Sequence, residues 1–155
     1  NMVSQGGGWY DMWNNTEEAT GYRIINTGLI PITDRFSINH VLTWGSADKI
    51  TSATDKSQLL SLVGRAQYQF TNYVRGIGEA GTFWQKETYT DGSDYKQRGQ
   101  KYTVALALAD GPEFMSRPEL RIFASYLKDG EKRKVFSDNT ANDTWNFGVQ
   151  VEAWW

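Results

Sequence analysis

The chain has 155 residues and a net charge of −2, with 18 acidic and 16 basic side chains. No long block of like charge interrupts this balance, which argues against a nucleic-acid partner. It has no cysteine and one histidine, so a disulfide and a usual transition-metal site are excluded, and we expect no cofactor. No apolar run approaches the roughly 20 residues of a membrane-spanning helix, but membrane strands escape that test because only every second residue is apolar.

Residues 1–18 are rich in glycine and asparagine, which predicts a long loop. Beyond them hydrophobicity alternates with period two, the pattern of strands whose successive side chains point to opposite faces. In one candidate, Leu60 and Leu62 share a face while Arg65 lies on the other. The predicted strands before the last one are Tyr22–Ile32, Phe36–Ser46, Gln58–Thr71, Val74–Lys86, Lys101–Ala109 and Glu119–Lys128.

The connections between these candidates alternate in length. The short ones are residues 33–35, 71–73 and 110–116, and the long polar ones are residues 47–56, 87–100 and 129–142. Tight turns that alternate with long loops along a meander are typical of outer-membrane barrels, which have short turns on the periplasmic side.

The last predicted strand is Asp143–Trp155, whose apolar face has an aromatic ring at each end, Trp145 and Trp155. Aromatic rings prefer the two membrane interfaces and aliphatic side chains prefer the hydrocarbon between them, so this order indicates a strand that crosses a bilayer. The alternative interpretation is an edge strand of a soluble β-sandwich.

The sequence therefore predicts an all-β fold, an antiparallel up-and-down transmembrane β-barrel with outward-facing Leu60, Leu106, Ile122 and Val149. About seven strands would leave two unpaired edges, which lipid does not tolerate. We expect residues 1–155 to be the C-terminal part of a single, larger porin β-barrel domain. Because such barrels are secreted and Asn1 is not a natural start, a signal peptide is expected upstream.

Two stretches resemble maltoporin and the related carbohydrate-specific porins of Gram-negative bacteria. They are Asp143-Thr-Trp-Asn-Phe-Gly-Val-Gln-Val-Glu-Ala-Trp-Trp155 and Ser116-Arg-Pro-Glu-Leu-Arg-Ile-Phe-Ala-Ser-Tyr126, with weaker support from Tyr22-Arg-Ile-Ile and Asn1-Met-Val-Ser-Gln-Gly. The resemblance implies a homotrimer of barrels with about eighteen strands each in the outer membrane. It also implies passive transport of sugars and oligosaccharides along a helical track of aromatic residues, and no enzymatic activity.

By motif position, Trp154 resembles one residue of this aromatic track. A ring at that place interrupts the polar face of Gln150 and Glu152, and its flat surface suits the C–H face of a pyranose. A second track position, just before the Ser-Arg-Pro segment, falls on Met115, which offers no ring. This departure favours sugars of the sucrose or β-glucoside type over maltodextrins. The alternative role for Trp154 is to fill the lumen against a loop.

Six charged residues share the predicted lumen face: Arg23, Arg65, Arg75, Glu79, Arg121 and Glu152. The simplest interpretation is a mutually paired, solvated wall that tunes the charge of the pore. Arg121 and Glu152 lie on neighbouring predicted strands, where they could also bind sugar hydroxyls. A basic cluster of Lys128, Lys132, Arg133 and Lys134 is either a solvated loop or a contact for lipopolysaccharide phosphates.

His40 lies on the apolar face and has no placed serine, cysteine or aspartate partner, so we predict no catalytic residue and no metal ligand. The favoured function is a sugar-selective channel in the outer membrane. The alternatives are a general diffusion porin without a sugar site, a soluble carbohydrate-binding β-sandwich and, last, an outer-membrane hydrolase.

Overall fold

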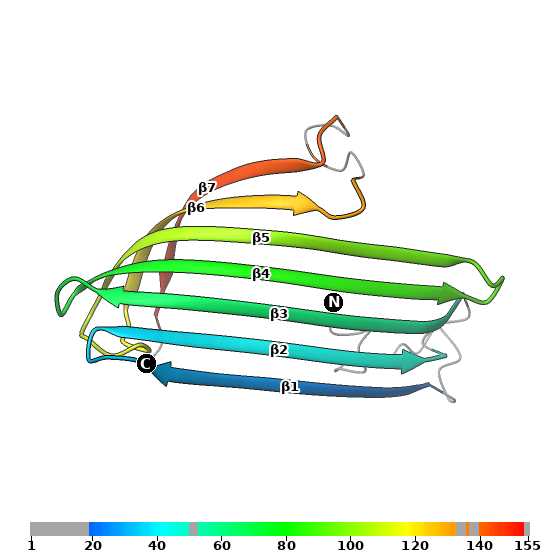
Figure 1. Cartoon of the computed structure of the whole chain (residues 1–155), viewed down its shortest axis with the longest axis horizontal. Coiled ribbons are helices and arrows are strands. Elements are labelled where there is room, and N and C mark those ends of the chain that lie inside the picture. The colour runs from blue at the N-terminus through cyan, green and yellow to red at the C-terminus, as the bar shows by residue number, and fades with distance from the viewer. Residues whose placement is uncertain (1–18, 50–52, 133–135, 137–139, 154–155) are drawn as a thin grey trace.

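The computed structural model of the protein describes residues 19–49, 53–132, 136 and 140–153. Seven antiparallel strands form one sheet, in which each strand pairs with its neighbours along the chain (Figure 1). The strands are β1 Thr20–Pro31, β2 Phe36–Asp48, β3 Thr54–Gln69, β4 Val74–Tyr89, β5 Asp94–Ala109, β6 Glu119–Asp129 and β7 Asp143–Glu152. The described residues contain no helix long and apolar enough to cross a membrane, a finding that concerns helices alone.

This topology confirms the predicted meander of seven strands. The starts of β2, β4, β6 and β7 fall on the predicted residues. A soluble sandwich would need two sheets packed face to face, and the described strands form a single sheet, so that alternative is wrong.

The prediction of a long loop at residues 87–100 is wrong. β4 and β5 continue through it to a tight turn at residues 90–93. Polar cross-strand contacts hold this extension, since Lys86 lies 3.0 Å from Asp94 and the Thr88 hydroxyl donates to the same carboxylate at 2.8 Å. The prediction failed because both faces of this extension are polar, which leaves no apolar alternation to identify a strand. The loop predicted at residues 47–56 is likewise shorter, since β2 ends at Asp48 and β3 begins at Thr54.

The turn between β4 and β5 is built from side chains suited to it. The Asp91 carboxylate accepts hydrogen bonds from the Ser93 hydroxyl at 2.6 Å and the Ser93 N–H at 2.8 Å. These bonds favour the ionised form and hold the pKa of Asp91 below its usual range. Gly92 has a φ of 83°, a conformation that residues with a Cβ rarely adopt. The turn therefore closes a long hairpin without a flexible loop.

One face of the sheet is apolar and exposed, and the other carries buried polar residues, which is the reverse of a soluble protein. Leu60, Leu106, Ile122 and Val149 lie on one face and are between 46% and 65% exposed. Among the described residues, the buried apolar side chains are Ala47, Ile77, Ala107 and Ala109. The buried polar or charged ones are Ser46, Ser57, Gln67, Arg75, Glu119, Arg121, Ser125 and Asp129. An apolar exposed face backed by a polar interior is the composition of a membrane barrel wall.

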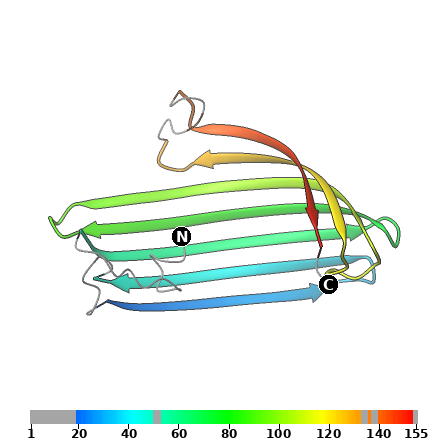
Figure 2. The ribbon, with the colours of Figure 1, turned by 180° about the vertical axis from the view of Figure 1, so that it is seen from behind.

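The sheet is curved. β1 to β5 run side by side as long ribbons, whereas β6 and β7 bend strongly, as both views show (Figures 1 and 2). A close contact accompanies the bend: a Cβ added at Gly148 of β7 would lie 2.6 Å from Phe123 of β6, the residue directly opposite. Only glycine leaves room for that ring. The curvature creates a concave inner face onto which the polar side chains converge.

Candidate functional site

The polar inner face is defined by the register of the sheet, because residues that lie directly opposite one another share a face. One such row runs from Arg65 of β3 through Glu79, Thr103 and Ser125 to Asn146 of β7. Arg65, Glu79, Arg121 and Gln150 together line a hollow of about 100 Å³ on this face. The concave side therefore carries the charged side chains, whereas the exposed apolar residues point away from it.

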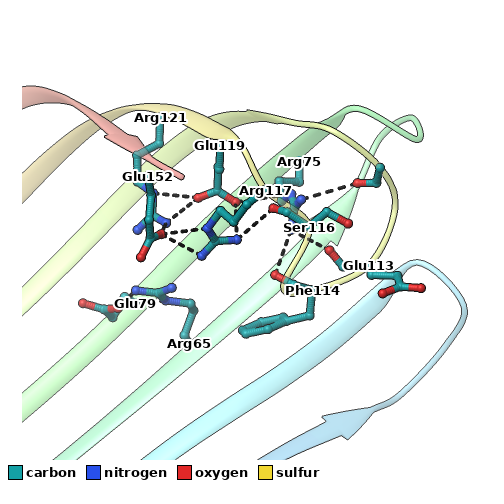
Figure 3. A network of polar contacts seen from close by, with 11 residues as sticks. Arg65, Arg75, Glu79, Glu113, Phe114, Ser116, Arg117, Glu119, Arg121 and Glu152 are labelled. Carbon is teal, nitrogen blue, oxygen red and sulfur yellow. Dashed lines mark hydrogen bonds and ion pairs between the residues drawn. The ribbon is translucent and has the colours of Figure 1, made fainter. Parts of the chain in front are cut away.

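The strongest feature of this face is an arginine–glutamate network at the end of the sheet where β6 begins (Figure 3). Arg75 and Glu119 have side chains only 2% exposed, and Nε of Arg75 lies 3.6 Å from the Glu119 carboxylate. Arg121 donates from Nε to Glu119 at 2.7 Å and from Nη2 to Glu152 at 2.9 Å. Arg117 also binds Glu152, at 2.7 Å. Three guanidinium groups therefore surround two carboxylates.

Arg75 also fixes the connection between β5 and β6, residues 110–118. Its Nη1 donates to the carbonyl oxygens of Glu113 and Phe114 at 3.1 and 3.0 Å, and its Nη2 donates to that of Gly111 at 3.4 Å. A guanidinium has five N–H donors in a rigid plane, which lets one side chain hold three carbonyls and a carboxylate. The connection is thereby folded over the inner face, and Phe114 and Met115 are placed at this end of the sheet.

A separate ion pair lies further along the inner face. Arg65 donates from Nε and Nη2 to one oxygen of Glu79, at 2.9 and 2.8 Å. The two side chains are 29% and 18% exposed, so this pair is partly open to solvent, whereas the Arg75–Glu119 pair is buried. Arg23, on β1, is exposed, and no hydrogen bond or ion pair joins its side chain to another described residue.

The structure thus brings five of the six predicted pore-lining residues into pairs. Arg75, Arg121 and Glu152 share one network, Arg65 and Glu79 form a second pair, and Arg23 stands apart. The expectation of a solvated wall fails at Arg75, which is 1% exposed because residues 110–118 cover it.

Arg117 and Glu119 were missed by the sequence analysis. A signal was present, since Arg117, Glu119 and Arg121 are spaced by two residues and so share one face of an extended segment. Glu119 was predicted as the first residue of its strand and is the first residue of β6, but it was not included among the charged residues of the inner face.

The remaining predicted residues lie in different places. Met115 is 59% exposed, while Trp154 and Trp155 lie outside the described residues. Lys128 and Lys132 are exposed, whereas Arg133 and Lys134 are likewise outside the described residues. His40 is on the outward face and its Nε2 lies 2.8 Å from the amide oxygen of Asn26, a cross-strand hydrogen bond. No group of metal-ligating side chains occurs among the residues that the structure describes.

Comparison with known proteins agrees with this geometry. The sequence matches the LamB porin family over residues 2–155. Maltoporin 2 of Yersinia pestis (strain Pestoides F) is 74% identical and Maltoporin 1 of Klebsiella pneumoniae subsp. pneumoniae is 75% identical, each over all 155 residues. Maltoporin 1 of Aeromonas salmonicida (strain A449) is 51% identical over the same length.

The chain spans 37% of the length of the Yersinia and Klebsiella relatives and 36% of the Aeromonas one. The matches nonetheless cover the whole of this chain, including both stretches on which the resemblance to carbohydrate-specific porins was based. That resemblance is confirmed: the chain belongs to the LamB porin family.

Proposed function

We propose that the full-length protein is an outer-membrane channel for the facilitated diffusion of sugars in a Gram-negative bacterium. The observation that carries this proposal is family membership combined with the inverted polarity of the sheet, apolar outside and charged inside. Residues 1–155 would form about seven strands of one larger porin barrel, and upstream strands would pair with the edges of β1 and β7. Closure of that kind satisfies the backbone groups that lipid cannot.

Maltodextrins are the favoured sugar class. The relatives at 74% and 75% identity are named maltoporins, which outweighs the preference for sucrose or β-glucosides that Met115 suggested. Met115 is exposed at the end of the inner face, where its thioether can contact a sugar face. Together with Trp154 it would form the last part of the sugar path.

The charged residues of the inner face would act as a fixed polar wall of the pore. Glu119 and Glu152 each accept hydrogen bonds from arginine, so neither carboxylate is free to act as a general acid or base. This arrangement favours a passive channel over a hydrolase, and we propose that the protein is not an enzyme. Arg23 lies on β1, the edge strand that an upstream strand would pair with, so its neighbours in the whole barrel would come partly from that strand.

The proposed assembly is a homotrimer in contact with lipopolysaccharide. Lys128 and Lys132 are exposed at the end of β6, at the opposite end of the strand from residues 110–118. If the short turns face the periplasm, as in porins, these lysines face the outer surface, where they would bind lipopolysaccharide phosphates.

Trp154→Ala tests the sugar path. Loss of an aromatic platform worth about 0.5–1.5 kcal/mol should weaken sugar binding by about two- to tenfold. The barrel should stay folded, because a pore-lining ring is not part of a packed core. The measurement is sugar-dependent block of ion current through the reconstituted full-length channel. Open-channel conductance should stay similar or rise slightly.

Trp155→Ala is the matched control, since the period-two pattern places it on the outward face beside Val151. It should leave sugar block unchanged. If Trp154→Ala channels are blocked as well as the parent by every sugar that binds, Trp154 is not a track residue. A parent channel that no sugar blocks would instead identify a general diffusion porin.

Deleting Trp155 should lower the amount of folded trimer. A terminal outward aromatic would anchor the chain at the membrane interface, and it resembles the signal by which barrels are recognised for assembly. The measurement is the heat-modifiable trimer band on gels of outer membranes from cells that express the full-length protein. An unchanged yield of folded trimer would contradict this role.

A further inference from the structure

A second hollow lies on the inner face, apart from the one that Arg65 and Glu79 line. It measures about 500 Å³ and lies between the turn that joins β1 to β2 and residues 110–118. Its lining includes Ser37 of β2, Gln67 and Gln69 of β3, Arg35 of the turn, and Glu113 and Phe114. The volume is within the range of small-molecule sites, about 300–1,000 Å³. We refer to it as the turn groove.

Phe114 supplies the apolar part of the turn groove. Its side chain is half-buried, and its carbonyl oxygen accepts the Arg75 hydrogen bond at 3.0 Å (Figure 3). Arg75 is in turn held by Glu119. The backbone that carries the ring is therefore anchored to a buried network, and this anchoring presents the ring at a fixed place rather than on a flexible loop.

Gln67 supplies the polar part. The residue is 4% exposed, and no hydrogen bond joins its side chain to another described residue. Every fully buried side-chain nitrogen or oxygen atom among the described residues has a hydrogen-bond partner, so the unpaired amide atoms of Gln67 keep access to the groove, where water or a ligand can bind them. The amide can donate and accept, which is what a sugar hydroxyl requires. Ser37 lies directly opposite Gln67 in the register and adds a hydroxyl to the same lining.

We propose that the turn groove is a sugar-binding subsite at the turn end of the pore, in which Phe114 contacts the apolar face of a pyranose and Gln67 binds its hydroxyls. This assignment rests on the proposed sugar channel and adds a site that is separate from Trp154 and Met115. A flat apolar ring beside an unpaired amide and a hydroxyl matches the alternation of C–H faces and O–H edges on a sugar. The subsite would hold the end of an oligosaccharide as it leaves or enters the pore on the turn side.

Full-length trimers with Phe114→Leu and Gln67→Leu test the proposal in planar bilayers. Leucine at position 114 keeps an apolar side chain but removes the flat ring. Leucine at position 67 keeps a side chain of similar size but removes the amide. Maltooligosaccharides added to one side at a time should bind about two- to tenfold more weakly to each variant, by analogy with other aromatic contacts. The loss should be larger for sugar added from the turn side. Phe114→Tyr should restore the binding of the parent, because it keeps the ring.

Phe147→Ala is the matched control, an aromatic residue that is 72% exposed on the outward face. It should leave sugar binding unchanged in both directions. Folded Phe114→Leu and Gln67→Leu trimers that bind every sugar like the parent would overturn the subsite while leaving the channel function intact. A loss that Phe114→Tyr does not restore would also overturn it, since it would show a packing role for position 114. A parent that no sugar blocks would refute the channel function itself, and the subsite with it.

Discussion

Glu119→Gln is expected to destabilise the folded trimer by about 3–5 kcal/mol, the typical cost of removing one partner from a buried ion pair. The Glu119 carboxylate is only 2% exposed and lies among Arg75, Arg117 and Arg121. Glutamine keeps the shape but removes the charge, so three guanidinium groups would share the single carboxylate of Glu152. Their mutual repulsion would then act in a site that water scarcely reaches.

The measurement is the denaturant concentration at which full-length trimers in detergent lose their heat-modifiable gel mobility. Glu79→Gln is the matched control, since that carboxylate pairs with one arginine and is partly open to solvent. Its expected cost is about 1 kcal/mol or less. Equal stability of the Glu119→Gln trimer and the parent would show that the network does not support the fold.

The stability of this wall depends on polar satisfaction rather than on an apolar core. Among the described residues, every fully buried side-chain nitrogen or oxygen atom has a hydrogen-bond partner. Arg75 illustrates why: its one side chain satisfies carbonyls that would otherwise face the interior of the barrel. In the proposed outer-membrane channel, lipid would cover the outer face, because it accepts apolar side chains without any internal packing.

The strand pattern was predictable because each strand core has one apolar and one polar face. Leu106 and Val149 alternate with small or polar neighbours, and that alternation is visible in a single sequence. The outer parts of β4 and β5 were not predictable, because β4 is polar there on both faces, with Lys86 and Thr88 on one and Gln85 and Glu87 on the other, and so resembles a loop. Pairing in that region is held by side-chain contacts that only the register brings together.

The types of residue in the candidate site were predictable, but the buried contacts of Arg75 and Glu119 were not. Arg121 and Glu152 could be placed on one face from their parity and on neighbouring strands from the order of the predicted meander. The contact from Arg75 to the carbonyl of Phe114 joins residues 39 positions apart through an irregular connection, and no periodicity encodes it. Because the fold of residues 110–118 determines which charges are buried, the role of Glu119 became visible only in three dimensions.

Gly148→Val is expected to destabilise the wall by about 1–3 kcal/mol, the usual cost of overpacking. A Cβ at this position would lie 2.6 Å from Cζ and 2.9 Å from Cε1 of Phe123, closer than real Cβ contacts allow. The ring would have to swing away from β7 toward the lumen, beside Arg121 and Gln150, which line the same hollow. The variant should therefore also reduce the open-channel conductance of the full-length trimer.

Gly64→Val is the matched control, because nothing lies within 4 Å of a Cβ built at Gly64. It points outward from β3, on the same face as Leu62, and should change neither stability nor conductance. Adding Phe123→Leu to Gly148→Val should recover part of both losses, since the smaller side chain vacates the space that the new Cβ needs. The measurements are the denaturation midpoint of the trimer and its single-channel conductance. A Gly148→Val trimer that matches Gly64→Val in both would mean that Phe123 relaxes freely, and that the close fit between β6 and β7 does not set the width of the pore.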